Sequence, residues 1–325
     1  MSEREQQPAS DQVGETWQQF VQALLGVLLL AGTAAVVRYY SPPPVTDLRH
    51  EEQELTRQVQ QLRQEQAMPT MVLNRYRNSI CYIYGVYQVS FVDGRIGLRA
   101  RLSGTGFVVA EGLLATNRHV AEPWYGDPDA EVLIRRGAKA QLEKLVAFFP
   151  GVPTPVVITP TVLSGKGDLA VLRMQDSEAI QQLTPLPLAE KPSRPGELVA
   201  VIGYPMGIAG MVAKSPTAVY ERLAYRHDDI GAANELAALS LIRPSATCGH
   251  LGDVVGDKLI YDAPTAHGGS GGPVFNARGE VIGVNSAYLD GFSGGTLGIS
   301  ADALRPLVQA AQGSQNTANS QPQNQ

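Results

Sequence analysis

One serine lies in a glycine-rich segment that could hold an acyl-transfer site. Ser270 lies within residues 267–273, where four glycines surround it and a proline follows them. Glycine is favoured where a backbone must adopt a positive φ or lie against a ligand. A serine in such a loop can present both its hydroxyl and its own N–H to one bound atom, as a nucleophile beside its oxyanion donors must. A glycine-rich surface turn without chemistry is the alternative interpretation.

A serine hydroxyl needs a base to take its proton and a third group to orient that base. His119 follows the apolar segment 112–116, so we expect its imidazole at the end of a strand rather than in a core. Asp168 precedes the apolar segment 169–174, so its carboxylate is expected to be partly buried, where it could accept from an imidazole N–H. Taken singly, a structural histidine and a turn aspartate are the alternatives.

The order of these three residues and the motifs around them resemble the trypsin-like (chymotrypsin-fold) serine peptidases, particularly their HtrA/Deg branch. The resemblance covers roughly residues 79–308 and rests on TNRHV at 116–120, GDLAVL at 167–172 and GGSGGP at 268–273. It implies that His119 is the general base, that Asp168 orients it and that Ser270 is the nucleophile. It also implies an oxyanion hole made by the backbone N–H groups of Gly268 and Ser270, with Gly269 between them.

The same resemblance predicts where a substrate would bind. Trypsin-like zymogens have an aspartate before the nucleophile that captures a new N-terminus, but Gly269 stands there, so control would need loop ordering or assembly. No acid lies between Ala263 and His267, so we expect cleavage after a small or medium aliphatic residue rather than after Lys or Arg. Strand addition along Val281–Ala287 would hold the substrate main chain. The expected substrate contacts are Pro264, Thr265, His267, Asn285, Ser286 and Ala287.

Short apolar segments separated by glycine and proline predict an all-β domain over residues 71–310. The expected strands are 80–92, 98–109, 112–116, 132–135, 142–149, 156–163, 169–174, 198–203, 250–255, 259–262, 273–276, 281–287 and 296–300. This pattern fits a sandwich or a pair of barrels. The resemblance selects two six-stranded antiparallel β-barrels, at about 78–176 and 197–308, with the site between them.

Residues 211–246 fit this strand pattern poorly and are expected to be an insertion into the second barrel. Residues 228–241 contain helix formers after Asp228, a candidate N-cap, which predicts a helix. A lid or partner surface near the site is one interpretation of the insertion. A packed helix without a functional role is the other.

An uncharged apolar segment, Phe20–Val37, follows an N-terminus, residues 1–19, that we expect to be disordered. As a helix it would be about 27 Å long, close to the thickness of a bilayer's hydrocarbon core. We therefore expect a transmembrane anchor over residues 20–40. A cleaved signal peptide and a buried core helix are the alternatives, and the acidic residues before the segment disfavour the signal peptide.

Residues 41–70 are expected to form a proline-rich exit followed by a helical spacer. The spacer has leucines at positions 48, 55 and 62 and ends at Met68-Pro69. Residues 47–66 could form a short coiled coil that makes a homo-oligomer, or a solvated helix. Residues 311–325 are expected to be a disordered tail, too short for the PDZ domain that HtrA-like proteins usually carry.

The composition limits the remaining functions. Of 325 residues 44% are apolar, and the formal net charge of −5, without a basic stripe, gives no reason to expect a nucleic-acid partner. No metal-ligand spacing or phosphate loop is present, so neither a metal nor a cofactor is expected. Cys81 and Cys248 could form a disulfide in an exported domain, but they fall in different barrels, which favours two buried thiols.

The sequence thus predicts a membrane-anchored serine endopeptidase of the HtrA/Deg type, acting on protein or peptide substrates in quality control or regulated proteolysis. The resemblance places its catalytic domain on the non-cytoplasmic side, periplasmic or extracellular. One alternative is a tethered protein that binds peptides with little turnover. Another is the same peptidase released by cleavage of an N-terminal export signal.

Overall fold

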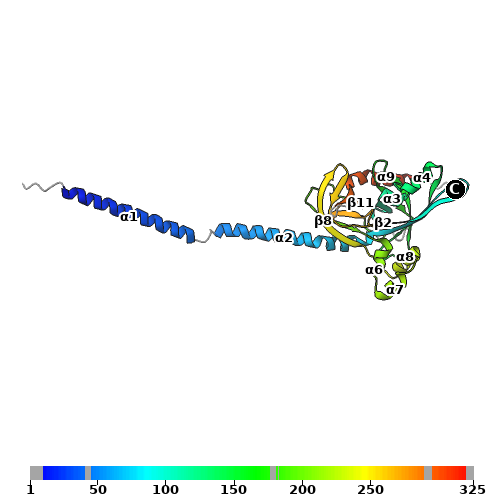
Figure 1. Cartoon of the computed structure of the whole chain (residues 1–325), viewed down its shortest axis with the longest axis horizontal. Coiled ribbons are helices and arrows are strands. Elements are labelled where there is room, and N and C mark those ends of the chain that lie inside the picture. The colour runs from blue at the N-terminus through cyan, green and yellow to red at the C-terminus, as the bar shows by residue number, and fades with distance from the viewer. Residues whose placement is uncertain (1–9, 41–44, 176–180, 182, 289–294, 320–325) are drawn as a thin grey trace, which may run out of the picture. The chain divides into compact units, whose positions relative to one another are not determined.

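The structure is a computed structural model that describes residues 10–40, 45–175, 181, 183–288 and 295–319. The chain divides into two compact units, residues 1–61 and 62–325. The first contains α1 (Ser10–Tyr40) and the beginning of α2 (Val45–Tyr76) (Figure 1). Residues 10–19, expected to be disordered, instead form the first turns of α1, which continues without a break into the apolar segment.

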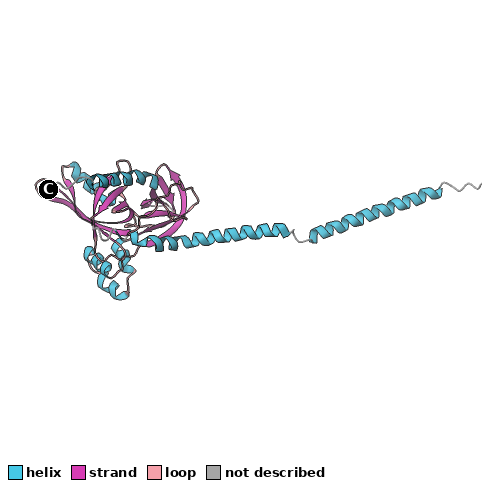
Figure 2. Ribbon diagram, turned by 180° about the vertical axis from the view of Figure 1, so that it is seen from behind, coloured by secondary structure: helices cyan, strands magenta, loops and turns pink. Residues whose placement is uncertain are grey.

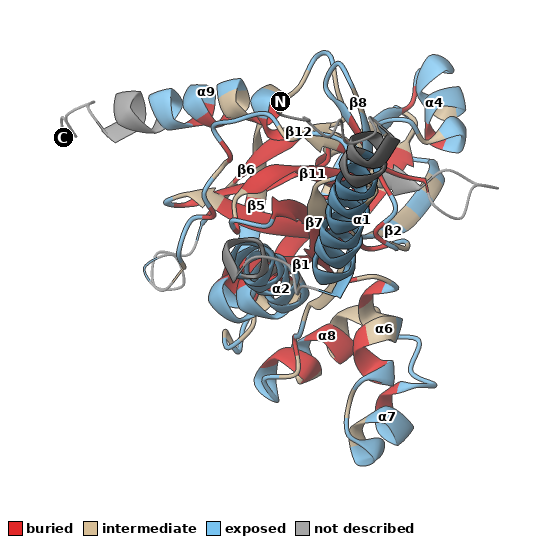
Figure 3. Cartoon of the chain, turned by 90° about the vertical axis from the view of Figure 1, so that its left-hand side faces the viewer, coloured by how far each residue is buried: buried red, intermediate tan, exposed pale blue. Residues whose placement is uncertain are grey.

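Within the described residues, one helical segment is long and apolar enough to cross a membrane. It covers Trp17–Tyr40, has a mean hydropathy of 2.3 and buries none of its window within the protein. Length and apolar composition of this kind are shared by membrane spans and signal sequences. Figure 3 draws α1 largely in pale blue, because the described side chains of this helix are mostly exposed.

The second unit contains two closed six-stranded barrels in which every neighbouring pair of strands is antiparallel (Figure 2). Barrel 1 has the strand order β1-β2-β3-β6-β5-β4 and barrel 2 the order β10-β11-β12-β9-β8-β7. The predicted fold of two such barrels is therefore confirmed. The strands of barrel 1 are β1 (Ile80–Ser90), β2 (Ile96–Ala110), β3 (Leu113–Thr116), β4 (Lys139–Phe148), β5 (Val156–Leu163) and β6 (Ala170–Met174). Those of barrel 2 are β7 (Leu198–Gly203), β8 (Ser245–Val255), β9 (Lys258–Tyr261), β10 (Pro273–Asn276), β11 (Val281–Tyr288) and β12 (Thr296–Ser300).

A shared apolar core holds the two barrels together. Large side chains from both barrels meet in one cluster of buried residues, which includes Tyr82, Phe107, Tyr204 and Phe275. The Tyr204 hydroxyl also donates to the Ile80 carbonyl at 2.9 Å, so the polar end of this buried ring is satisfied. This shared core fixes the two barrels against each other, so that residues at the facing ends of the barrels are held at defined positions.

The end of α2 belongs to this core. Met68, Val72 and Tyr76 lie on one face of the helix and are 1%, 0% and 4% exposed, and the Tyr76 ring stacks on Phe275 at 5.6 Å. The helix therefore continues through Pro69, where we expected it to end. A proline inside a helix costs about 3 kcal/mol. Burial of three large apolar side chains contributes about 1.5–3 kcal/mol each, which outweighs that cost.

The C-terminal helix α9 (Ala301–Asn319) corrects the expectation of a disordered tail from residue 311. Leu304, Val308 and Ala311 form a buried stripe at helical spacing, and each is at most 7% exposed. This stripe anchors the helix on the barrels, and the polar residues that follow continue it to Asn319.

The insertion in barrel 2 begins at Gly207, earlier than expected, and contains three helices between β7 and β8. They are α6 (Gly207–Ala213), α7 (Thr217–Leu223) and α8 (Asp229–Ala238), which gather on one side of the barrels (Figure 1). The Asp228 side chain accepts from the Gly231 N–H and caps α8, as its sequence predicted.

One expected strand is wrong. Residues 132–135 belong to α4 (Pro128–Arg135), because Asp127 caps the N-terminus by accepting from the Asp129 and Ala130 N–H groups, and Pro128 occupies the first helical position. The cysteine expectation is half right. Both thiols are unbridged, but only Cys81 is buried, whereas Cys248 is exposed.

Candidate active site

The structure brings His119 and Asp168 into direct contact at the facing ends of the barrels. His119 lies in the short helix α3 (Arg118–Ala121) after β3, and Asp168 lies just before β6. The His119 Nδ1 atom is 2.7 Å from Asp168 Oδ2, and the His119 backbone N–H donates to Asp168 Oδ1 at 2.9 Å. With Nδ1 occupied in this way, Nε2 of the neutral ring is left to accept a proton.

A buried side chain joins the two turns that carry this pair. Asn117 is fully buried, and its amide nitrogen donates to the Asp168 backbone carbonyl at 2.8 Å. The strands behind these turns pair directly, with Thr116 on β3 opposite Ala170 on β6. The separation of His119 and Asp168 is therefore set by sheet register rather than by a flexible loop.

Hydrogen bonds keep the Asp168 carboxylate charged. Burial acts to raise the pKa of Asp168, but hydrogen bonds from His119 and Ser286, with the attraction of the imidazole, outweigh it and lower the pKa. The Ser286 hydroxyl donates to Asp168 Oδ2 at 2.9 Å. An ionised carboxylate in this position can stabilise an imidazolium that forms next to it.

Ser270 lies in the loop between β9 and β10, and Ser286 on β11 connects it to the acidic residue. The Ser270 hydroxyl donates to the Ser286 backbone carbonyl at 2.9 Å. Among the described residues no hydrogen bond joins this hydroxyl to the His119 ring. Ser286 thus bonds to both Ser270 and Asp168, and Asp168 in turn bonds to His119, so the three predicted residues are linked through Ser286 without a direct bond between Ser270 and His119.

Two backbone amides in the Ser270 loop have no acceptor among the described residues. Gly268 has a φ of +90°, and the Gly269 N–H donates to the Ala266 carbonyl at 2.9 Å, which together define a type II turn. Within the part of the chain that the structure describes, the N–H groups of Gly268 and Ser270 have no acceptor. Two amides without partners beside a serine hydroxyl can bind the oxygen of a tetrahedral intermediate.

The glycines are required because this loop is packed from both sides. A Cβ atom at Gly271, whose φ is +87°, would collide with the Thr105 carbonyl and the Thr116 hydroxyl. A Cβ atom at Gly269 would collide with the Thr265 hydroxyl. The alternative of a free surface turn is therefore excluded by the packing of Gly268 and Gly269, which are buried.

The residues expected to contact substrate lie in three different environments. Pro264 and His267 are exposed, and Thr265 is partly exposed beside the glycine-rich loop. Asn285 was expected to pair with the substrate main chain, but its N–H and carbonyl bond to Gly272 and Gly271, and its side chain, 1% exposed, faces the loop. Ser286 bonds to Asp168 and Ser270 as described above, and the side chain of Ala287 lies outside the described residues.

Three residues that position the loop were missed from the sequence. The Met206 N–H donates to the His267 carbonyl at 2.6 Å, the Thr105 hydroxyl donates to the Gly268 carbonyl at 2.7 Å, and Tyr261 supports Asn285. The positive φ of 63° at Met206 is backbone strain that a sequence does not reveal.

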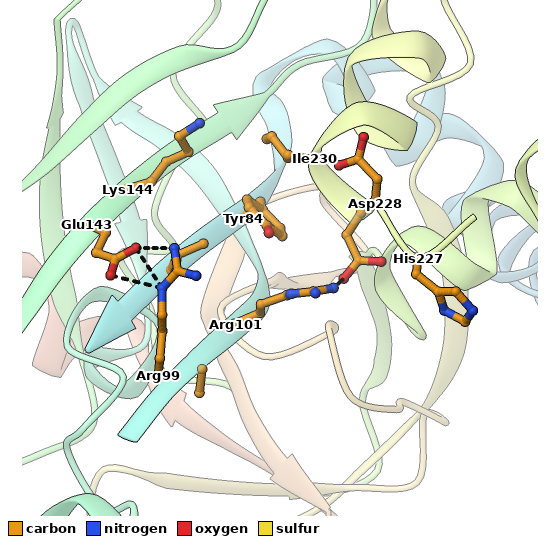
Figure 4. A pocket seen from close by; sticks show the side chains of 11 residues that line it. Tyr84, Arg99, Arg101, Glu143, Lys144, His227, Asp228 and Ile230 are labelled. Carbon is orange, nitrogen blue, oxygen red and sulfur yellow. Dashed lines mark hydrogen bonds and ion pairs between the residues drawn. The ribbon is translucent and has the colours of Figure 1, made fainter. Parts of the chain in front are cut away.

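Two cavities border the barrels, and one of them reaches the candidate site. A cavity of about 880 Å³ borders Asp168 and Ser286 and extends along β12 and α9. A more polar cavity of about 430 Å³ lies between barrel 1 and the start of α8, where Arg99 and Glu143 point toward each other (Figure 4). Arg101 bonds to Asp229 at 2.8 Å across this second cavity and ties the insertion to barrel 1. No group of His, Cys, Asp and Glu side chains among the described residues could hold a metal ion.

Comparison with known proteins finds a family model, described as trypsin-like peptidase domain, that matches residues 104–284. A probable periplasmic serine endoprotease DegP-like of Rhizobium meliloti (strain 1021) is 30% identical over 209 residues, 64% of this chain and 31% of that protein. The mitochondrial serine protease HTRA2 of Bos taurus is 29% identical over 208 residues, 63% of this chain and 35% of that protein. A glutamyl endopeptidase of Staphylococcus epidermidis is 27% identical over 197 residues, 58% of this chain and 55% of that protein. The chain thus spans about a third to about half of the length of these relatives.

Proposed function

Because the chain belongs to the family of trypsin-like peptidases, we propose that it is a serine endopeptidase of the HtrA/Deg type that hydrolyses peptide bonds in proteins. Ser270 is the nucleophile, His119 the general base and Asp168 the group that orients the base. The observation that carries the proposal is the His119–Asp168 hydrogen bond of 2.7 Å beside a serine whose loop holds two amides without acceptors.

Catalysis begins with a rotation of the Ser270 side chain. Its hydroxyl leaves the Ser286 carbonyl and turns toward Nε2 of His119, a change between staggered rotamers of one side chain. A substrate segment beside the end of β11, beyond the residues that pair with β10, would donate a main-chain N–H to the Ser286 carbonyl and compete with the hydroxyl for it. Substrate binding would in this way release the nucleophile to its base.

The chemical steps then follow from the positions of the proton and the charge. Ser270 Oγ bonds to the substrate carbonyl carbon as its proton passes to His119, and the Gly268 and Ser270 amides hold the resulting oxyanion. When the C–N bond breaks, His119 returns the proton to the leaving amine. Water then attacks the acyl-enzyme with His119 again as base, which frees the carboxylic acid and restores Ser270.

Labelling with a fluorophosphonate tests this assignment directly. We expect covalent capture at Ser270 that is abolished by Ser270→Ala and by His119→Ala, because the reagent needs an activated hydroxyl. His227→Ala is the matched control, since His227 is exposed between α7 and α8 and should not affect labelling. Full labelling of the His119→Ala variant would contradict the assignment.

A tethered peptide-binding protein with little turnover is the second candidate. The observation that favours it is the bond from the Ser270 hydroxyl to Ser286, which leaves the hydroxyl away from His119. Such a protein would bind peptides and release them intact, and it would resist the fluorophosphonate. Incubation with unfolded casein, followed by mass spectrometry of the fragments, distinguishes the two.

The side-chain preference of the proposed peptidase is for a small or medium aliphatic residue before the cleaved bond. No acid lies between Ala263 and His267, where a binding site for Lys or Arg would need one. One relative is named a glutamyl endopeptidase, so a profile with a peptide library must include glutamate as well as aliphatic and basic residues at this position. Preferential cleavage after Arg would contradict this part of the proposal.

The Trp17–Tyr40 segment is proposed to anchor the protein in a membrane, with the catalytic unit on the non-cytoplasmic side. The length and apolarity of this segment support an anchor, and the name of the Rhizobium meliloti relative places that protein in the periplasm. Fractionation of cells that express the full chain tests the anchor, and protection from an added protease tests the side. A mature protein that begins after residue 40 would favour the cleaved export signal instead.

Residues 47–66 are proposed to support a homo-oligomer. Leu55, Val59 and Leu62 are 56%, 44% and 57% exposed along one face of α2, as the helix of a coiled coil would be without its partner. Sedimentation of the detergent-solubilised chain should show a larger species that Leu55→Ser with Leu62→Ser dissociates. The control is Gln53→Ser with Gln60→Ser, which changes two polar positions of the same helix. If the leucine variant kept the mass of the wild type, as the control should, residues 47–66 would not be the segment that self-associates.

A further inference from the structure

A buried polar chain runs from barrel 2 to the glycine-rich loop. The Tyr261 hydroxyl donates to Asn285 Oδ1 at 2.7 Å, and Asn285 Nδ2 donates to the Gly269 carbonyl at 2.8 Å. Tyr261 and Asn285 are each 1% exposed, so water cannot replace either bond. Burial raises the pKa of Tyr261 well above its ordinary value, which keeps the hydroxyl protonated and able to donate.

The direction of the Asn285 amide follows from these partners. A backbone carbonyl can only accept, so the amide nitrogen has to face Gly269 and the amide oxygen has to face the Tyr261 hydroxyl. The Thr265 hydroxyl, 3.3 Å from Nδ2, is a second acceptor on the same side. Two side chains hydrogen-bond to Asn285, those of Tyr261 and Thr265. Both are uncharged at neutral pH.

The Gly269 carbonyl shares a planar peptide unit with the Ser270 N–H. In a trans peptide the C=O and the N–H point in opposite directions. A donor that holds the Gly269 oxygen on one side therefore turns the Ser270 N–H to the other side, where it has no acceptor among the described residues. The Gly272 N–H supports the same orientation by donating to the Gly269 oxygen at 3.1 Å.

Among the described residues, no charged side chain bonds to the Gly269 carbonyl. A side chain at position 269 would collide with Thr265, so no acidic residue can anchor the peptide from that position. The Asn285 backbone adds two further bonds, donating to the Gly272 carbonyl at 2.8 Å and accepting from the Gly271 N–H at 2.7 Å. One strand residue thus holds the loop at three positions, Gly269, Gly271 and Gly272.

From this geometry we infer that Asn285, oriented by Tyr261, is a positioning residue for the oxyanion hole, because it sets the direction of the Ser270 N–H. This role rests on the proposed peptidase function. It also replaces the substrate contact expected at Asn285, since the side chain acts on the catalytic loop and not on the substrate.

The test compares Asn285→Ala, Asn285→Asp and Tyr261→Phe with the wild type in the full-length solubilised protein. Loss of one oxyanion donor costs about 10²–10³-fold in kcat, so we expect Asn285→Ala to lose about 10–100-fold in kcat per folded molecule, with KM within twofold. Tyr261→Phe leaves the amide in place without its orienting partner and should lose about threefold to tenfold.

Asn285→Asp supplies a readout that a merely structural role would not give. An ionised carboxylate repels the Gly269 carbonyl, whereas a protonated one can donate to it as the amide does. The ratio of kcat for this variant to that of the wild type should therefore rise as the pH falls. A ratio that stays flat with pH overturns the positioning role.

The control is Asn276→Ala. Asn276 is 2% exposed on β10 but bonds to Glu280 and to the Arg278 and Glu280 N–H groups, away from the loop. It should lower the melting temperature without lowering kcat per folded molecule. If the wild type turns over substrate and Asn285→Ala matches it or matches Asn276→Ala, the positioning role alone is overturned. A wild type without turnover overturns the proposed function and this role with it.

Discussion

The two halves of the candidate site are held in place by different means. In barrel 1, His119 and Asp168 bond to each other through their side chains, on turns whose strands pair directly. In barrel 2, Ser270 is positioned through the backbone of its loop, whose carbonyls are held by residues from other segments. Side-chain chemistry is therefore concentrated in one half and backbone geometry in the other, so substitutions should affect the two halves differently.

The largest effect should come from removing the reacting groups, one from each half. We expect Ser270→Ala and His119→Ala each to lower kcat by about 10⁴–10⁶-fold, with little change in the melting temperature. The double variant should lose no more than either single one, because the two side chains act as one unit. If single-turnover kinetics showed that the two losses add in the double variant, Ser270 and His119 would act independently, and the proposal that they form one catalytic unit would be wrong.

Gly271→Ala tests the backbone half without changing any reacting group. The added methyl group would collide with the Thr105 carbonyl, and the native backbone would hold alanine at a positive φ. We therefore expect about a 100-fold or greater loss of kcat and a lower melting temperature. Gly126→Ala is the control, because Gly126 has a φ of +75° but open space around its Cβ position. Similar kcat values for the two variants would contradict tight packing of the loop.

Ser286→Ala tests the residue that joins the halves. The substitution removes the hydroxyl that donates to Asp168 but keeps the backbone carbonyl that accepts from Ser270. A hydrogen bond to a charged group contributes about 1.5–3 kcal/mol, part of which neighbouring water can restore here, so we expect about a tenfold loss of kcat. Steady-state kinetics on a peptide substrate measure it, and an unchanged kcat would show that Asp168 orients His119 without help from the Ser286 hydroxyl.

The smallest effect should appear in the pH dependence of stability. The pKa of Asp168 is lower in the folded protein than in the unfolded chain, so its ionised form stabilises the fold. This contribution is fully present above the unfolded value of about 3.9 and is lost as the pH falls through the lowered folded value. Denaturant unfolding of the wild type and Asp168→Asn should therefore differ most near neutral pH and converge in acid. A difference that is constant from pH 7 to pH 3 would contradict this linkage.

The same division explains how much could be predicted from the sequence. His119, Asp168 and Ser270 could be proposed together because their order and the motifs around them resemble those of the trypsin-like serine peptidases, and the structure brings His119 and Asp168 into contact. Local patterns also sufficed for strands such as β5 and β10, whose bounds agree with those expected.

What the sequence did not reveal depends on contacts between distant segments. Asn285 was interpreted as a substrate contact because its hydrogen bonds to Tyr261 and Gly269 exist only after barrel 2 closes. Proline predicts a helix end at position 69, whereas the burial of Met68 and Tyr76, which offsets the cost of Pro69, is a tertiary effect. The helix α4 is the exception, since the Asp127-Pro128 capping signal was present and outweighed the apolar residues that suggested a strand.

The last turns of α2 have a practical consequence for producing the catalytic unit in isolation. Tyr76 stacks on Phe275 of β10, the strand that follows the nucleophile loop, and Met68 fills the same interior. A shortened chain that begins at residue 71 or 78, where the sequence alone would set the edge of the domain, lacks Met68 and leaves a void in the core that both barrels share. Expression should begin upstream of Met68 if the soluble fragment is to retain its shape.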